Sequence, residues 1–259
     1  MDVRVHGPAP PGPFLSARDL LVTEHGLDRP VDVYVRENPD ERTWTAHDED
    51  HHVLNISRQA ATSAMARELT LHEYAHMVRH EESHPSHTQR TDEALFLALA
   101  GESVEQHKLT HCFQIANHMK DIYADDITLT VAPADKLVSF MESSLAAAVS
   151  DRPGEPPQGA MTAVRNGGFQ RLTPASDPDI TAVNAAFALA LLERHGLADP
   201  DHRIYDLAYA AARDSTEVSL STFKRLFASL GPDPDESEYR KALVDATREY
   251  VIGGGKAAD

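Results

Sequence analysis

The segment His72-Glu73-Tyr74-Ala75-His76 has the residue types and spacing for metal-assisted hydrolysis. Residues four apart on a helix emerge one turn apart on the same face, so the imidazoles of His72 and His76 can bind one tetrahedral metal ion. Glu73 lies beside the first ligand, where its carboxylate can take a proton from a water at the metal and pass it to a leaving group. We therefore expect one Zn²⁺ per chain, with Glu73 as the general base.

The sequence around this motif predicts the helix that the spacing requires. The stretch MARELTLHEYAHMVRH contains no proline, and Leu71, Ala75 and Val78 are available for packing. The predicted helix begins at Ala60 or Ser63 and ends at Glu82, before a proline.

Two further histidines continue the four-residue spacing but are not expected to bind the same metal. His80 lies two turns from His72, a rise of about 12 Å. We expect His80 and His84 to be exposed polar residues at the end of the helix, and His51 and His52 to flank a strand. Eleven of the 15 histidines lie between His47 and His118, so histidine clustering alone is not specific.

A catalytic zinc ion takes a third protein ligand, and the next two predicted helices, 92–106 and 110–128, offer several. Asp121 and Asp125 again have the four-residue spacing of one helix face. A simpler interpretation of this pair is a solvated acidic face, since the chain is rich in acids. The other possible third ligands are Glu102, Glu105, His107, His111 and His118.

Together, HEYAH and the later D-I-Y-A-D at 121–125 resemble the gluzincin metallopeptidases. In that family a helix with HExxH is followed by a helix with E-x-x-x-D, often ending in Ala-Asp. The resemblance covers about residues 31–126 and implies a peptide or protein substrate. It implies Glu73 as the base and His72, His76 and Asp121 as the zinc ligands. It also implies that Asp125 is the partner that orients one ligand imidazole.

This chain departs from the gluzincin pattern at one ligand. The family usually has glutamate where this chain has Asp121, so the shorter side chain requires the two helices to lie closer together. Related enzymes also use a histidine, tyrosine or arginine to stabilise the oxyanion of the reaction. By this resemblance the candidates here are Tyr123, His202 and Tyr205.

The charge balance of the chain argues against two classes of partner. The formal net charge is −17, with 23 Asp and 18 Glu but only 6 Lys. Such a surface repels nucleic acids and anionic membranes, so neither is an expected partner. The Asp-rich, Lys-poor composition resembles that of halophilic archaeal proteins and would place the chain in an uncharacterised archaeal group of this broad class. An ordinary acidic protein is the alternative.

Cysteine usage and the absence of long apolar stretches indicate a cytoplasmic protein. Cys112 is the single cysteine, which excludes an intramolecular disulfide and a cysteine-rich zinc site. The first residues, MDVRVHGPAP, do not resemble a secretory signal. No apolar run reaches the length of a membrane span.

Residue patterns predict an α+β fold that is predominantly helical. Alternating stretches at 31–36, 43–46 and 52–56 and a short stretch at 3–5 predict a small N-terminal antiparallel sheet. Beyond residue 58 the apolar residues recur with the period of a helix, and this pattern continues through a segment that follows Pro133. The sequence thus predicts a sheet, the HExxH helix pair and a C-terminal helical bundle.

Three regions are expected along the chain. Residues 1–150 form a zincin-like metal-binding catalytic region, 151–178 a linker rich in Pro and Gly, and 179–259 a C-terminal helical region. The predicted helices of the C-terminal region are 180–195, 204–212, 220–230 and 236–251.

The function predicted from these motifs is zinc-dependent amide hydrolysis by a metallopeptidase. A non-catalytic zinc-binding scaffold or interaction protein is the alternative, in which the metal serves stability alone. A metal-dependent hydrolase of non-peptide amides is a third interpretation, because the chemistry of the site is shared.

Overall fold

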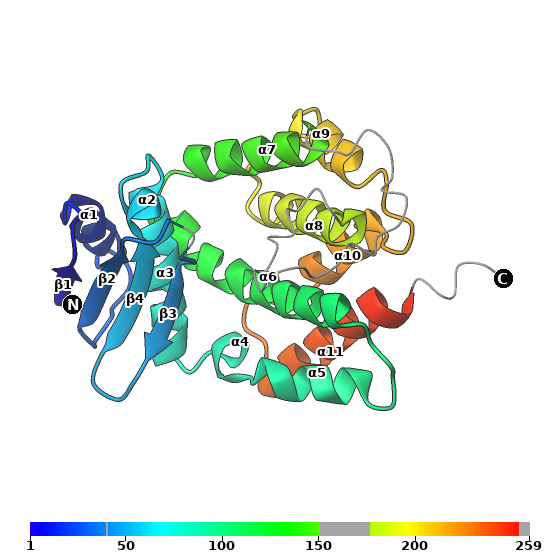
Figure 1. The fold of residues 1–259 in the computed structure, drawn as a ribbon, viewed down its shortest axis with the longest axis horizontal. Helices are drawn as coiled ribbons and strands as arrows, with labels where there is room; N and C mark the ends of the chain where they lie inside the picture. The colour runs from blue at the N-terminus through cyan, green and yellow to red at the C-terminus, as the bar shows by residue number, and fades with distance from the viewer. Residues whose placement is uncertain (40, 151–176, 254–259) are drawn as a thin grey trace. The chain divides into compact units, whose positions relative to one another are not determined.

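The computed structural model describes residues 1–39, 41–150 and 177–253 and confirms an α+β fold that is predominantly helical (Figure 1). The predicted linker at 151–178 lies outside these residues except for its last two. The described elements are β1 (Val3–His6), α1 (Gly12–Leu21), β2 (Val31–Arg36), β3 (Trp44–His47), β4 (His52–Ser57), α2 (Arg58–Ala61), α3 (Ala66–Glu81), α4 (Pro85–Thr88), α5 (Thr91–Leu99), α6 (Gln106–Val131), α7 (Asp135–Ser150), α8 (Pro178–Arg194), α9 (Ile204–Ala211), α10 (Leu220–Ala228) and α11 (Glu236–Ile252).

The four strands form a mixed sheet in the order β1-β2-β4-β3. The predicted antiparallel sheet was wrong in its strand directions, since β1 pairs with β2 and β2 with β4 in parallel. Helix α1 connects β1 to β2 as a crossover, and a crossover of this kind brings the two strands into parallel alignment. Only β3 and β4, joined by the short turn at residues 48–51, pair antiparallel. Strand β3 is therefore an edge of the sheet.

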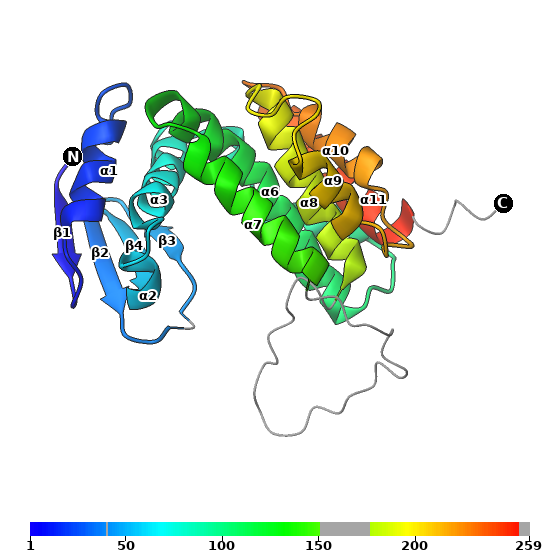
Figure 2. The ribbon, with the colours of Figure 1, turned by 90° about the horizontal axis from the view of Figure 1, so that it is seen from above.

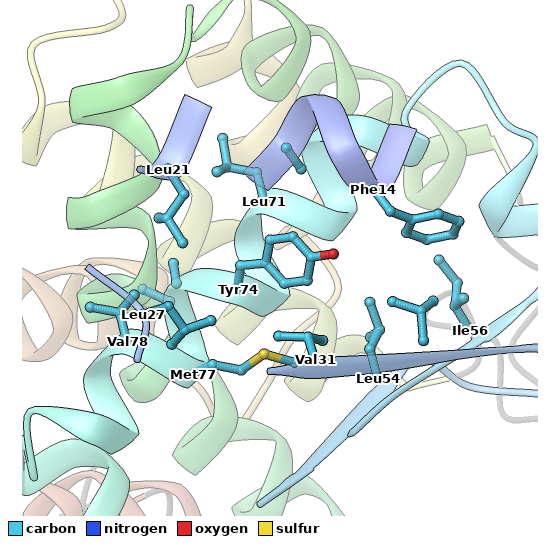
Figure 3. Packing of buried hydrophobic residues seen from close by; sticks show 14 of the residues in the cluster. Phe14, Leu21, Leu27, Val31, Leu54, Ile56, Leu71, Tyr74, Met77 and Val78 are labelled. Atoms are coloured by element: carbon cyan, nitrogen blue, oxygen red, sulfur yellow. The ribbon is translucent and has the colours of Figure 1, made fainter. Parts of the chain in front are cut away.

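Helices α1 and α3 pack on one face of this sheet around an apolar core (Figure 3). Strand β2 alternates buried and half-buried residues, as its sequence VDVYVR predicts. The side chain of Tyr74 on α3 lies within this core and is fully buried. The core side chains that Figure 3 labels are Phe14, Leu21, Leu27, Val31, Leu54, Ile56, Leu71, Tyr74, Met77 and Val78. Because this face of α3 is fixed by packing, its polar face with the histidines is held in a defined orientation.

The chain reverses direction sharply after α3. The backbone N–H of Ser83 donates to the carbonyl of His80, and that of His84 donates to the carbonyl of Arg79. These two bonds form a Schellman motif, in which the residue after the cap adopts the left-handed conformation that glycine usually occupies. Here Ser83 has a φ of 53°. The turn leads directly into the short helix α4, with Pro85 at its first position.

The chain forms two compact units, each made of separated stretches. The first unit comprises Met1–Phe96, Ala116–Leu137 and Gly231–Leu243, and the second comprises Leu97–Ile115, Val138–Leu230 and Val244–Asp259. In the second unit, the largely buried helix α8 packs against α9 and α10 (Figure 2). The predicted boundaries at 150 and 178 remain a prediction. Among the described helices, none is long and apolar enough to cross a membrane.

Candidate metal centre

The part of α6 from Ala116 onward belongs to the first unit, where it lies against α3 with both apolar and polar contacts. Ala124 and Ile127 of α6 belong to the same apolar core as Leu71 and Val78 of α3. A hydrogen bond from the Arg79 side chain (Nε) to the main-chain carbonyl of α6 at position 123, 3.0 Å long, adds a polar connection. Beside this apolar packing, the predicted ligands of the two helices face each other.

The structure brings three of the predicted ligands together. The Nε2 atoms of His72 and His76 lie 3.0 Å apart. Oδ1 of Asp121 lies 3.6 Å from Nε2 of His72 and 3.3 Å from Nε2 of His76. Within the described part of the chain, this is the one group of three or more potential ligands whose donor atoms lie within 4.8 Å of one another.

These distances fit a single zinc ion. Two ligand atoms that are each about 2.0–2.1 Å from a tetrahedral zinc ion lie about 3.3–3.4 Å apart. The three observed separations, 3.0, 3.3 and 3.6 Å, bracket this value. Two imidazoles and one carboxylate also form a donor set that zinc accepts in catalytic sites. The side chains of His72, His76 and Asp121 retain 23, 14 and 24% of their exposure, so the centre is reachable from solvent.

Each imidazole is held on its far side by a second hydrogen bond. Nδ1 of His72 lies 2.8 Å from Oδ1 of Asp125, which is buried. Nδ1 of His76 lies 2.7 Å from Nε2 of His87, a residue at the end of α4. Partners of this kind orient metal-binding histidines and fix which nitrogen carries the proton. Asp125 therefore lies where the gluzincin resemblance implied, whereas His87 was not anticipated.

Electrostatics couple the ligand side chains. Burial lowers the pKa of His72, but the carboxylates of Asp125 and Asp121 outweigh this effect and hold the pKa well above its usual value. Burial raises the pKa of Asp121, but hydrogen bonds from His118, His72 and His76 outweigh it and hold that pKa well below its usual value. In the absence of metal, these two shifts favour a protonated His72 beside an ionised Asp121.

Glu73 is a half-buried carboxylate next to this ion pair. Burial raises its pKa, and Asp121 adds to the increase, while His72 and His76 act in the opposite direction. The net direction is upward, which brings the pKa of Glu73 closer to neutral pH. A carboxylate with a raised pKa can both take up and release a proton near neutrality.

The alternative third ligands are distributed differently. His118 is one turn before Asp121 on α6, and its Nδ1 lies 3.5 Å from Oδ2 of Asp121. His111 is buried in the second unit, where its Nδ1 lies 2.6 Å from the hydroxyl of Tyr250. The helix predicted at 92–106 ends earlier, at Leu99, where the chain turns through Gly101 with a φ of 88°. Glu102, Glu105 and His107 follow in exposed positions.

The three predicted oxyanion candidates have distinct surroundings. Tyr123 is buried on α6, with its ring centroid 4.6 Å from that of His84 and 5.9 Å from that of Tyr239. His202 and Tyr205 belong to the second unit. His202 Nε2 lies 3.8 Å from Oε1 of Glu142. The assignment of His202 and Tyr205 to catalysis stays a prediction.

Tyr239 on α11 was not considered as a site residue from the sequence. It is fully buried, and its hydroxyl has no hydrogen-bond partner among the described residues. Its ring centroid lies 5.9 Å from that of Tyr123 on α6. Burial raises the pKa of Tyr239, and Tyr123 and Asp121 contribute to the increase. No sequence signal identifies this tyrosine, because only the tertiary fold brings it beside Tyr123 of α6.

Two expectations about neighbouring histidines need correction. His84 is buried, with 6% exposure, because the turn at Ser83 directs the chain back over α3. His52 does not merely flank a strand: it begins β4 and is fully buried, with its Nε2 2.9 Å from Oε1 of Glu81. His80 is half-buried and stacks on His47, with ring centroids 4.1 Å apart.

Comparison with known proteins assigns a family but no activity. The chain belongs to a family of unknown function (DUF5781), which it matches over residues 1–252. No match was found among curated proteins or among solved structures.

Proposed function

We propose that this protein is a zinc-dependent hydrolase that cleaves amide bonds, most simply those of peptides. The observation that carries the proposal is the convergence of His72 Nε2, His76 Nε2 and Asp121 Oδ1 at separations that fit one tetrahedral zinc ion. Asp125 on the far nitrogen of His72 supports the same interpretation. A cytoplasmic location, expected from the single cysteine, belongs to this proposal.

The residues around the centre have different roles in the proposed reaction. His72, His76 and Asp121 would hold the ion, which supplies Lewis-acid activation of water and of the scissile carbonyl when bound. Glu73 takes a proton from the attacking water and passes it to the leaving nitrogen. Its raised pKa suits both steps, because the carboxylate must accept the proton and then give it up.

The test compares the wild-type protein with Glu73→Gln in two separate measurements. Zinc content is measured by mass spectrometry on protein purified without a His tag, and hydrolysis is measured on a peptide library and a panel of small amides. Glu93→Gln, an exposed change on α5, is the matched control. Assays run at low and at molar salt, because the acidic composition also fits a salt-requiring protein.

We expect about one zinc per chain in all three proteins and a loss of about 10²–10⁴-fold in hydrolysis for Glu73→Gln alone. Cleavage of small amides but not peptides would narrow the proposal to a non-peptide hydrolase. Zinc without any hydrolysis, with unfolding temperature following metal content, would favour the scaffold alternative. Wild-type protein that takes up no zinc would refute the proposal.

A further inference from the structure

A chain of hydrogen bonds runs from His76 through α4. Nδ1 of His76 lies 2.7 Å from Nε2 of His87, and Nδ1 of His87 lies 2.7 Å from Oγ of Ser86. The same Oγ lies 2.7 Å from Nδ1 of His84. All four side chains belong to the first unit, and His84 and Ser86 are buried.

The donor and acceptor roles in these hydrogen bonds can be assigned starting from His84. The backbone N–H of Ser86 donates to Nδ1 of His84 at 3.2 Å, and a backbone N–H can only donate. Nδ1 of His84 is therefore an acceptor, so the Ser86 hydroxyl must donate to it. The hydroxyl oxygen then accepts from Nδ1–H of His87. If His87 carries a single proton, that proton lies on Nδ1, and Nε2 accepts a proton from Nδ1 of His76.

This arrangement requires His84 and His87 to be neutral, because a doubly protonated imidazole has no acceptor nitrogen. Burial is the largest cause that lowers the pKa of each residue. Arg79 lowers the pKa of His84 further, and His76 and Lys120 lower that of His87. Both shifts favour the neutral imidazole.

We propose that His87, held by Ser86 and His84, is a positioning residue that keeps the proton of His76 on Nδ1 and directs the lone pair of Nε2 to the metal. This inference rests on the proposed function for the role of the metal. The direction of the links from His84 to Nδ1 of His87 is independent of it, because the backbone N–H of Ser86 sets that direction.

The two ligand histidines would then be held by different chemistry. His72 is paired with the carboxylate of Asp125, whereas His76 is paired with a neutral imidazole. A neutral acceptor fixes the ring and its tautomer without adding a second buried negative charge beside Asp121. Removing His87 should therefore disturb the orientation of His76 more than the net charge of the centre.

The experiment uses the full chain and two readouts. The tautomer of His76 in metal-free protein is read from its ¹⁵N imidazole shifts, and zinc affinity is measured by competition with a chromophoric chelator. The variants are His87→Ala, which removes the acceptor, and His87→Gln, whose side-chain carbonyl can replace it. Ser86→Ala removes the next link, and Thr88→Ala, an exposed change on the same short helix, is the control.

We expect wild-type His76 to carry its proton on Nδ1 and His87→Ala to lose this preference together with about 10–100-fold in zinc affinity. His87→Gln should restore most of both, and Thr88→Ala should match wild type. In Ser86→Ala, His87 loses the acceptor for its Nδ1–H, so its own tautomer preference should weaken.

Wild-type His76 protonated on Nε2 would overturn the inference. So would His87→Ala with unchanged tautomer and unchanged affinity. If His87→Ala does not fold, Ser86→Ala tests the inference instead. An unchanged His87 tautomer in that variant would overturn it. A wild-type protein that binds no zinc refutes the proposed function, while the ¹⁵N measurement still tests the hydrogen bonds from His76 to His84.

Discussion

Asp125 Oδ1 lies 2.8 Å from Nδ1 of His72. Asp121 lies one helical turn before Asp125, and its Oδ1 faces Nε2, the other nitrogen of the same ring. The imidazole of His72 is thus held between two carboxylates of α6. Asp125 is buried, whereas Asp121 remains partly exposed. One helix face therefore places a carboxylate at each nitrogen of His72.

Replacing Asp125 tests its role in orienting His72. Because Asp125→Ala removes the acceptor for His72 Nδ1–H, we expect zinc affinity to fall by about 10–100-fold while His72, His76 and Asp121 stay in place. Competition titration with a zinc chelator measures the change. Asp135→Asn, an exposed acid at the start of α7, should leave the affinity unchanged. Equal affinities in Asp125→Ala and wild type would show that Asp125 has no role in orienting the ligand.

The raised pKa of His72 predicts how pH affects the metal-free protein. A raised folded-state pKa means that protonated His72 stabilises the fold. That contribution is fully present below the ordinary histidine pKa of 6.5 and is lost as pH rises through the raised pKa. Unfolding free energy of the metal-free protein, measured in urea, should fall over this window. His72→Gln should remove this component of the pH dependence.

Zinc binding should have the opposite pH dependence. A ligand imidazole must lose its proton, whereas Asp121 is already ionised because its pKa lies well below the usual value. In the range between pH 6.5 and the raised pKa of His72, zinc affinity should therefore rise by about tenfold per pH unit. Calorimetry in buffers of different ionisation enthalpy should detect about one proton released per zinc. An affinity that does not change with pH would contradict a protonated His72.

Two pairs of residues in the candidate site were predictable from local periodicity, whereas their convergence was expected only from the gluzincin resemblance. The four-residue spacings of His72 with His76 and of Asp121 with Asp125 place each pair on one helix face wherever the helix packs. Strand direction was not predictable in the same way, since alternation in VDVYVR indicates a half-buried strand but not its partner. The crossover through α1 determines the parallel pairing.

The parts of the site that escaped prediction depend on tertiary structure. His84 and His87 reach α3 because Ser83 adopts the left-handed conformation, which a serine does not signal. Tyr239 comes from the last helix, far from the motif in sequence. Neither His87 nor Tyr239 carries a pattern that separates it from an ordinary surface or core residue, and the four-residue spacing of His84 did not indicate that it is buried.

Tyr239 and Tyr74 form a matched pair for testing the catalytic surroundings. Both are fully buried, and neither hydroxyl has a hydrogen-bond partner among the described residues. The ring of Tyr239 lies 5.9 Å from that of Tyr123 on α6, whereas Tyr74 lies in the apolar core of α1, α3 and the sheet (Figure 3). A buried hydroxyl without a partner costs about 1–3 kcal/mol, so changing either tyrosine to phenylalanine should not reduce stability.

Activity should separate the two variants. If the hydroxyl of Tyr239 donates to the oxyanion of the reaction, Tyr239→Phe should lower kcat by about 10²–10³-fold, with little change in KM and zinc content. Tyr74→Phe should retain wild-type kcat, because its hydroxyl faces the apolar core. Thermal unfolding of both variants should occur at or above the wild-type temperature. Full activity in Tyr239→Phe would exclude this hydroxyl from catalysis and return the role to Tyr123, His202 or Tyr205.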